Sequence, residues 1–355
     1  MKEVPRPLAS SAFGMAFQQK AKVIYPIKLA INETMVPVST ATMVMPREAE
    51  LFGRNYVFKL FTAAGVSGYY RVQSFDIDYS SDTVTYQLEH MIAEVGDWCI
   101  MQAHSGNYAA ATAIRRLWRG SDASGTSDDS YRGDHWVLGD MTVMDGVTVE
   151  LEASNRANLL TSLLDVMDGL PGIYMDFDYS EYPWIIDFSS MSASAYQDRA
   201  HGRLSRNISS ANVSFDFTDL CTRARYVYSG TWRVYNAEEQ QGLYGIVEGT
   251  ASTSGASSLA RAQYMAKEFL RKNQEPRISI SMSGQDLYAI TGITPDRLKI
   301  GKLFTLFVPE LDTTITRNIT SLKWNDVYND PLNVSVTLGE EDPTLWAYLK
   351  SIKKK

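Results

Sequence analysis

Short alternating segments of strand length recur along this chain, and they constrain its fold more than any other feature. In residues 83–88 (TVTYQL) and 332–338 (LNVSVTL), apolar side chains alternate with polar ones. Because successive side chains of a β-strand point to opposite faces, each segment predicts a strand with one buried and one polar face. Further segments rich in β-branched and aromatic residues lie at 23–31, 55–61, 69–77, 173–177, 184–188 and 213–217. We therefore expect a mainly β protein of the α+β class.

Three helices are expected between these strands. Apolar residues recur at helical spacing in 107–120, 155–169 and about 258–272. Asn107 and Asn155 precede the first two, and an asparagine before the first turn is a favourable N-cap. The residues from 98 to 204 therefore combine helices with strands, in contrast to the β-rich segments on either side.

Composition excludes several classes of protein. The 355 residues contain 34 Lys and Arg against 41 Asp and Glu, a net charge of −7 that argues against a broad DNA-neutralising face. Two cysteines are too few for a disulfide scaffold. We find no apolar run of membrane-spanning length and expect no signal peptide. The 20 Tyr and 7 Trp against 13 Phe favour β structure and contact surfaces.

The common motifs of catalysis and of metal or nucleotide binding are missing from the sequence. There is no GxxxxGK[ST], GxGxxG, GxSxG, CxxC or HExxH. The four histidines are scattered along the sequence, at His90, His104, His135 and His201. Cys99 beside Trp98 is interpreted as a small buried hydrophobic residue. We expect no catalytic residue, no metal and no cofactor, and hence no enzyme.

The strongest acidic group is Asp176, Asp178, Glu181 and Asp187, on a predicted hairpin. Carboxylates across a hairpin can act as acid and base on a glycosidic bond, or bind a cation. Strand alternation alone places Asp176 and Asp178 on the wet face, and we favour that interpretation.

Other charged clusters have simple structural explanations. Arg115, Arg116 and Arg119 form a basic helix face that could contact nucleic acid or an acidic partner, but a solvated helix flank is favoured. Residues 121–134 are interpreted as an exposed loop, and Lys353–Lys355 as a tail too short to specify a partner. The loop carries four acidic residues without EF-hand spacing: Asp122, Asp128, Asp129 and Asp134.

Two segments share one order of elements. In both 53–89 and 301–340, a glycine and a basic residue precede three strand-like segments, with a polar turn before the third. The pattern predicts either a repeated small β-domain or two ordinary antiparallel meanders.

Three stretches together resemble the hub proteins of phage tails and contractile injection systems, including the hub part of prophage tail-associated lysins. The first runs from YRVQSFDI at 70–77 to TVTYQLEH at 83–90. The second runs from Asn158 through PWIIDF at 183–188 to DLCTRARYVYSG at 219–230. The third joins IGKLFTL at 300–306 to NVSVTLGE at 333–340. The resemblance covers about residues 22–340.

The resemblance implies two small antiparallel tube-type β-barrel domains with an inserted α/β domain. We expect a domain order that follows the chain, with the first barrel assembled from two segments. The chain comprises an N-terminal arm (1–21), a first β-barrel (22–97 with 205–235), the inserted α/β domain (98–204), a linker and helix (236–275), a second β-barrel (276–341) and a C-terminal tail (342–355).

The same resemblance implies a structural role in the virion, at the phage tail tip. Three copies, each with two similar barrels, would form a pseudo-six-fold ring that joins a hexameric tail tube to a three-fold tip. The expected partners are further copies of the chain as a homotrimer, the tail tube or distal tail protein, the tape-measure protein and a tip or spike protein, with DNA only as transiting cargo. We expect synthesis in the host cytoplasm and no lysin module. The alternatives are a cell-wall polymer hydrolase that uses the acidic hairpin and a carbohydrate-binding tail adhesin.

Overall fold

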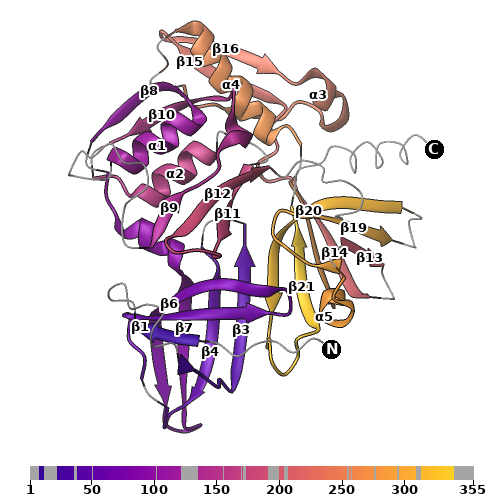
Figure 1. Ribbon diagram of the computed structural model, residues 1–355. Coiled ribbons are helices and arrows are strands. Elements are labelled where there is room, and N and C mark those ends of the chain that lie inside the picture. The colour runs from indigo at the N-terminus through magenta and orange to yellow at the C-terminus, as the bar shows by residue number, and fades with distance from the viewer. Residues whose placement is uncertain are drawn as a thin grey trace. The chain divides into compact units, whose positions relative to one another are not determined.

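The structure is a computed structural model that describes most of the chain. The described residues are 8–11, 22–35, 38–49, 51–100, 102–120, 135–154, 156–168, 170, 173–190, 200–203, 207–253, 256, 258–275, 277–293, 296–308 and 313–339. They divide into two compact units, Asn212–Ile280 and the rest of the chain. Figure 1 shows the elements, most of which are strands.

The N-terminal part of the larger unit is an antiparallel sheet with the strand order β3-β4-β7-β6-β5-β1-β2. Its strands are β1 (Leu8–Ser11), β2 (Lys22–Val23), β3 (Lys28–Thr34), β4 (Thr40–Pro46), β5 (Tyr56–Thr62), β6 (Gly65–Asp78) and β7 (Thr83–His90). The alternation predicted at 83–88 is confirmed, since Val84, Tyr86 and Leu88 are buried. The arm expected at 1–21 contains a strand, because β1 pairs with β5.

The C-terminal strands continue the same sheet. They are β13 (Ala200–Arg203), β14 (Ile208–Asp216), β18 (Arg277–Gln285), β19 (Leu303–Val308), β20 (Thr313–Trp324) and β21 (Asn333–Leu338), and the short helix α5 (Leu287–Thr291) follows β18. Strand β20 pairs with β3, and Trp324 lies opposite Ile31 in the register. Both side chains are buried, so the two β-rich segments share one core at this seam.

The two segments of the predicted repeat form the same local topology. β5, β6 and β7 make one antiparallel meander, and β19, β20 and β21 make another.

The mainly β fold class is confirmed, since most of the described elements are strands. In the described residues the strand pairings run along an open path from β14 to β2, and the two barrels remain a prediction.

The inserted region between the meanders contains two helices and two small sheets. Its elements are β8 (His104–Ala109), α1 (Ala110–Gly120), β9 (Trp136–Leu138), β10 (Thr148–Ala153), α2 (Leu159–Asp168), β11 (Ile173–Asp178) and β12 (Trp184–Ser190), with 3-10 helices at Met91–Asp97 and Thr142–Met144. β8 pairs with β10, and β12 lies between β11 and β9. α1 and α2 lie side by side (Figure 1) and enclose a core with Trp118, Trp136 and Trp184.

The predicted helix starts were partly wrong. Asn107 lies inside β8, where it pairs with Glu150, so it does not cap α1. Asn155 lies outside the described residues, and the side chain of Asn158 accepts the hydrogen bond from Thr161 N at 2.9 Å at the start of α2. An asparagine three residues later therefore serves the first turn of that helix.

The smaller unit is a three-stranded sheet covered by a helix. Its elements are β15 (Arg223–Tyr228), β16 (Thr231–Asn236), α3 (Glu238–Tyr244), β17 (Glu248–Thr250) and α4 (Leu259–Asn273). Figure 1 shows α4 across β15 and β16, and Ala262, Ala266 and Leu270 pack with Ala224 and Tyr226. Ser258 caps α4 through its hydroxyl, which accepts from Arg261 N at 3.1 Å.

This grouping differs from the expected one. We assigned 205–235 to the first β-domain and 236–275 to a linker and helix, but β15 and β16 form their own sheet with β17 and share a core with α4. The physical reason is that the apolar stripe of α4 needs a sheet face to cover it. Strand β14 in turn neighbours β18 in the C-terminal sheet.

None of the described helices combines the length and apolar character that a bilayer crossing requires.

Candidate functional site

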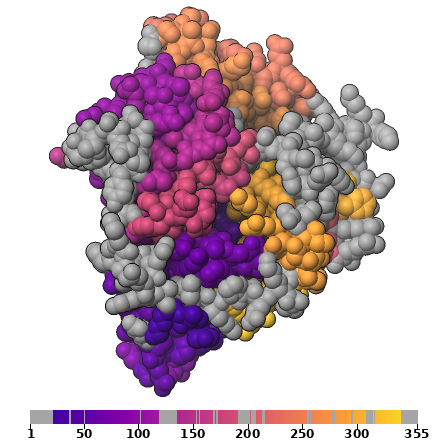
Figure 2. All heavy atoms as spheres, viewed as in Figure 1, coloured from indigo at the N-terminus to yellow at the C-terminus, as the bar shows by residue number. Residues whose placement is uncertain are grey.

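A polar cavity of about 190 Å³ lies where three parts of the larger unit meet. The N-terminal sheet contributes Glu33 from β3, Ser67 from β6 and His90 from the end of β7. The β11–β12 hairpin contributes Asp176 and Tyr179, and the segment before β19 contributes Arg297 and Lys299. Figure 2 shows a hollow between the surfaces of these three parts. The cavity thus collects charged and polar groups from segments far apart in the sequence.

His90 and Tyr179 form a short hydrogen bond in the wall of this cavity. The Nδ1 atom of His90 accepts from Ile92 N at 3.3 Å, so the ring proton is on Nε2, which donates to the hydroxyl of Tyr179 at 2.5 Å. Burial lowers the pKa of His90 to about 3 and is also the largest of the causes that raise the pKa of Tyr179. Since His90 stays neutral near pH 7, this pair is suited to holding two segments together rather than to proton transfer.

Glu33 is the group in this cavity that titrates near neutral pH. Burial raises its pKa from 4.5 to about 7, and the nearby Asp286 carboxylate also raises it. A hydrogen bond with Ser67 and the positive charges of Arg297 and Lys299 act in the opposite direction. A carboxyl whose pKa lies near 7 is an uncommon group that often marks a functional position.

Glu33 was not among the site residues predicted from the sequence, although the sequence contained a signal for it. Leu29 and Ile31 are fully buried on one face of β3, and Glu33 is the next residue on that face. A carboxylate that continues a buried stripe is expected to be desolvated. We interpreted only the apolar part of this alternation.

The acidic hairpin does not converge on the cavity as a group. Of its four carboxylates only Asp176 lines the cavity, where it pairs with Lys299 at 2.5 Å. Asp178 accepts from Ser180 N at 2.8 Å, and this bond is the main cause that lowers its pKa. Asp187 lies opposite Asp176 in the register and accepts from Asp140 N at 2.7 Å. Each of these three aspartates thus has a local structural partner.

The remaining predicted histidine and cysteine positions are scattered. His104 lies on β8, and His135 contacts Glu94 with 2.8 Å between Nδ1 and Oε2. Cys99 is exposed, which corrects its interpretation as a buried residue, whereas Cys221 is buried. The side chain of His201 lies outside the described residues. Within the described part of the chain, no group of side chains is suited to hold a metal ion.

The basic helix face and the predicted loop are only partly described. Arg115 and Arg116 are exposed on α1, and the guanidinium of Arg116 lies 4.4 Å from the ring centroid of Tyr108. The side chain of Arg119 lies outside the described residues, as do the acidic loop at 121–134 and Lys353–Lys355. The contact with Tyr108 gives Arg116 a partner within its own domain.

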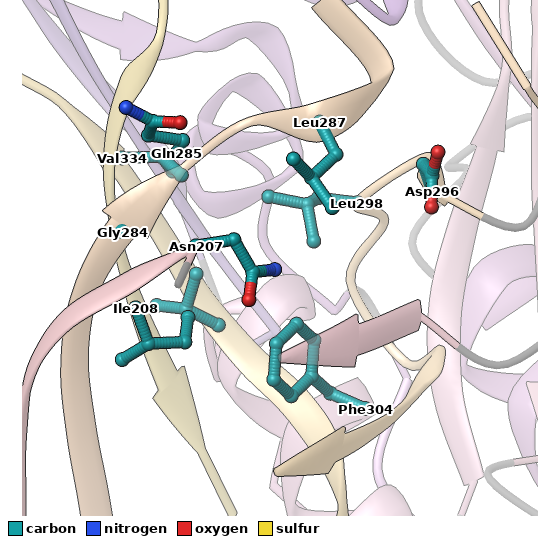
Figure 3. A pocket seen from close by; sticks show the side chains of 10 residues that line it. Asn207, Ile208, Gly284, Gln285, Leu287, Asp296, Leu298, Phe304 and Val334 are labelled. Carbon is teal, nitrogen blue, oxygen red and sulfur yellow. The ribbon is translucent and has the colours of Figure 1, made fainter. Parts of the chain in front are cut away.

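A second pocket, between β14, β18 and β19, is too small for a substrate. Figure 3 shows Asn207, Ile208 and Phe304 among the side chains around it, and its volume is about 10 Å³, enough for one water molecule at most. A Cβ atom on Gly284 would lie 2.5 Å from Asn207 O, so the backbones of β14 and β18 approach closely here.

The fold is shared with tail proteins of known structure, two of which come from prophages. Prophage tail protein gp18 of Listeria monocytogenes matches with a TM-score of 0.60 and 13% identity, over 99% of this chain and 100% of its own. The 43 kDa tail protein of prophage MuSo2 from Shewanella oneidensis matches with a TM-score of 0.63 and 10% identity, over 94% and 97%. A tail protein of Neisseria meningitidis matches with a TM-score of 0.61 and 12% identity, over 95% and 97%.

A scan against models of protein families and a search of curated protein sequences found no match. At identities of 10–13%, the likeness concerns the fold, and it extends over nearly the whole chain in all three cases. The chain therefore has the fold of these tail proteins, and the resemblance that its sequence suggested is confirmed at the level of the fold.

Proposed function

We propose that this chain is a structural protein of a phage tail and acts as a homotrimeric hub at the tail tip. The observation that carries the proposal is the likeness of fold, over nearly the full length of both chains, to three tail proteins, two of which come from prophages. A fold alone does not specify function, but none of the sequence motifs of catalysis or nucleotide binding supports a different class.

The internal organisation supports the three-fold part of the proposal. Two antiparallel meanders in one chain, joined through the pairing of β20 with β3, are suited to two tube-type modules. Three copies would then present six modules to a hexameric tail tube or distal tail ring, and a three-fold face to a tip or spike protein. The proposed ring encloses an axial conduit through which DNA passes, with the tape-measure protein as a further partner during assembly.

The oligomeric state tests this proposal directly. Size-exclusion chromatography with light scattering on the full chain is expected to give three times the chain mass, and negative-stain images are expected to show rings. A protein that stays monomeric at high concentration and forms no rings would overturn the homotrimer.

The same proposal assigns no catalysis to the chain. The aspartates of the acidic hairpin have an ion pair or backbone hydrogen bonds as partners, such as Lys299 for Asp176 at 2.5 Å. We therefore expect the purified chain to release no fragments from bacterial cell walls. If it does, and the variants D176N and D178N lose that activity while they still assemble, the hydrolase alternative replaces the structural role.

A further inference from the structure

The sheet of the smaller unit has one face covered by α4 and one face that no described element of this unit covers. α4 packs against Ala224 and Tyr226 on β15. In the register of β15 with β16, Arg225 lies opposite Val234, and Val227 lies opposite Trp232. Because residues directly opposite each other in a sheet share a face, these four side chains lie on the side away from α4.

This second face exposes large apolar side chains. Trp232 is 59% exposed and Val234 is 54% exposed. β16 is an edge strand, since the sheet order is β16-β15-β17, and each of its six residues is exposed. An uncovered edge with exposed aromatic and β-branched residues is typical of a contact surface.

Charged groups lie beside the exposed apolar side chains of β16 and hold this face in one geometry. The guanidinium of Arg225 lies 5.5 Å from the ring centroid of Trp232. Glu248 on β17 pairs with Arg223 at 3.1 Å and with Arg225 at 3.4 Å, so it fixes both arginines on this face. Tryptophan and arginine are the residues most often found at the energetic centre of protein interfaces.

The distribution of charge along the chain indicates which partner fits. The segment 212–280 has eight Lys and Arg against seven Asp and Glu, whereas the rest of the chain has the remaining 26 against 34. The acidic net charge of the protein therefore resides outside this unit. Arg223 and Arg225 together with Glu248 leave one positive charge on this face, which is complementary to the acidic remainder of another copy of the same chain.

We propose that the uncovered face of the β15–β16–β17 sheet, with Trp232, Val234 and Arg225 at its centre, docks on an acidic surface of a second copy of this chain. The proposal rests on the proposed homo-oligomer and identifies one side of its interface. Trp232 supplies buried apolar area on docking, and Arg225, which lies against its ring, supplies charge pairing.

A pair of matched double variants of the full chain tests the proposal. The face variant is W232S with R225E. The control variant is Y264S with R261E, which removes the cation–π pair on α4 of the same unit, where Arg261 lies 5.2 Å from the ring centroid of the 51%-exposed Tyr264. Sedimentation velocity over a concentration series is expected to show self-association weakened about tenfold or more in the face variant, and changed by less than about twofold in the control. Thermal melts check that both variants fold.

Each outcome separates the docking surface from the oligomer itself. If the wild type assembles and the face variant assembles equally well, the docking surface is overturned and the homotrimer stands. A wild type that remains monomeric overturns both. As a second measurement, V234C in a C99S background is labelled with a benzophenone photo-crosslinker in a mixture of ¹⁴N and ¹⁵N chains. Crosslinks between differently labelled chains support the proposal, and crosslinks confined to single chains contradict it.

Discussion

His90 at the end of β7 donates a 2.5 Å hydrogen bond to the hydroxyl of Tyr179, which follows β11. The bond joins the N-terminal sheet to the inserted α/β region. His90 also contacts the Tyr70 and Phe177 rings, at centroid distances of 5.5 Å and 4.8 Å. The contact is therefore a mixed polar and aromatic seam whose strength can be measured by single substitutions.

We expect Y179F to lower the free energy of unfolding by about 1–3 kcal/mol. The ring contacts of Tyr179 remain, but the buried Nε2–H group of His90 loses its acceptor, and an unsatisfied buried donor costs that amount. Chemical denaturation of the full chain measures the change. The control is Y79F, because Tyr79 is 74% exposed and its substitution should change stability by less than about 0.5 kcal/mol. Equal losses in the two variants would contradict the role of the hydrogen bond.

We expect G68A to destabilise the same seam. A Cβ atom on Gly68 would lie 2.9 Å from His90 Cδ2 and 3.2 Å from the Tyr179 hydroxyl, so both side chains would have to shift away from the added atom. Such overpacking typically costs about 1–3 kcal/mol. The matched control is G242A in α3, where nothing lies within 4 Å of the added atom. An alanine in that helix should stabilise the chain by about 0.4–1 kcal/mol. The two alanine substitutions should therefore shift the melting temperature in opposite directions.

The sequence alone predicted many of the elements, because strand alternation and helical periodicity are local signals. The strands at 83–88 and 333–338 and the helix α4 follow from a few neighbouring residues. The start of α1 did not, because the backbone of Asn107 belongs to a strand pair with Glu150, 43 positions later. The pairing of β8 with β10 outweighs the local preference of asparagine for an N-cap position.

The grouping of the elements could not be predicted in the same way. Alternation locates a strand but does not identify its neighbours, so the pairing of Trp324 with Ile31 across the β20–β3 seam leaves no local trace. The same limit explains why β15 and β16 were assigned to the first β-domain. The polar cavity at Glu33 was missed for a related reason, since it depends on three segments that meet only in the folded chain.

The ion pair of Lys299 with Asp176 is expected to stabilise the folded chain only slightly. Lys299 Nζ and Asp176 Oδ2 are 2.5 Å apart, but the side chain of Lys299 is 51% exposed and that of Asp176 is 27% exposed. Exposed pairs contribute about 0.2–1 kcal/mol. A double-mutant cycle with K299Q and D176N, measured in low salt, should give a coupling energy in this range that falls in 1 M NaCl, where charges are screened. A coupling energy that does not respond to salt would point to a packing contact instead.

The final prediction concerns pH, because His90 and Glu33 should give stability opposite slopes. The pKa of His90 falls from 6.5 to about 3 on folding, so between these values the unfolded chain binds the extra proton and stability declines as the pH falls. The pKa of Glu33 rises from 4.5 to about 7, so in that window the folded chain binds the extra proton and stability declines as the pH rises. Between about 4.5 and 6.5 the two contributions offset each other.

The variant E33Q separates them. Its stability relative to the wild type should rise with pH between about 4.5 and 7 and be constant outside that range, because only the wild type loses the bound proton there. In a second variant, S67A, the hydrogen bond that lowers the pKa of folded Glu33 is removed, so the decline in stability should still begin near pH 4.5 but extend to higher pH than in the wild type. Thermal melts in buffers from pH 4 to pH 9 measure both. A stability difference between E33Q and the wild type that does not change with pH would show that Glu33 does not titrate in this range.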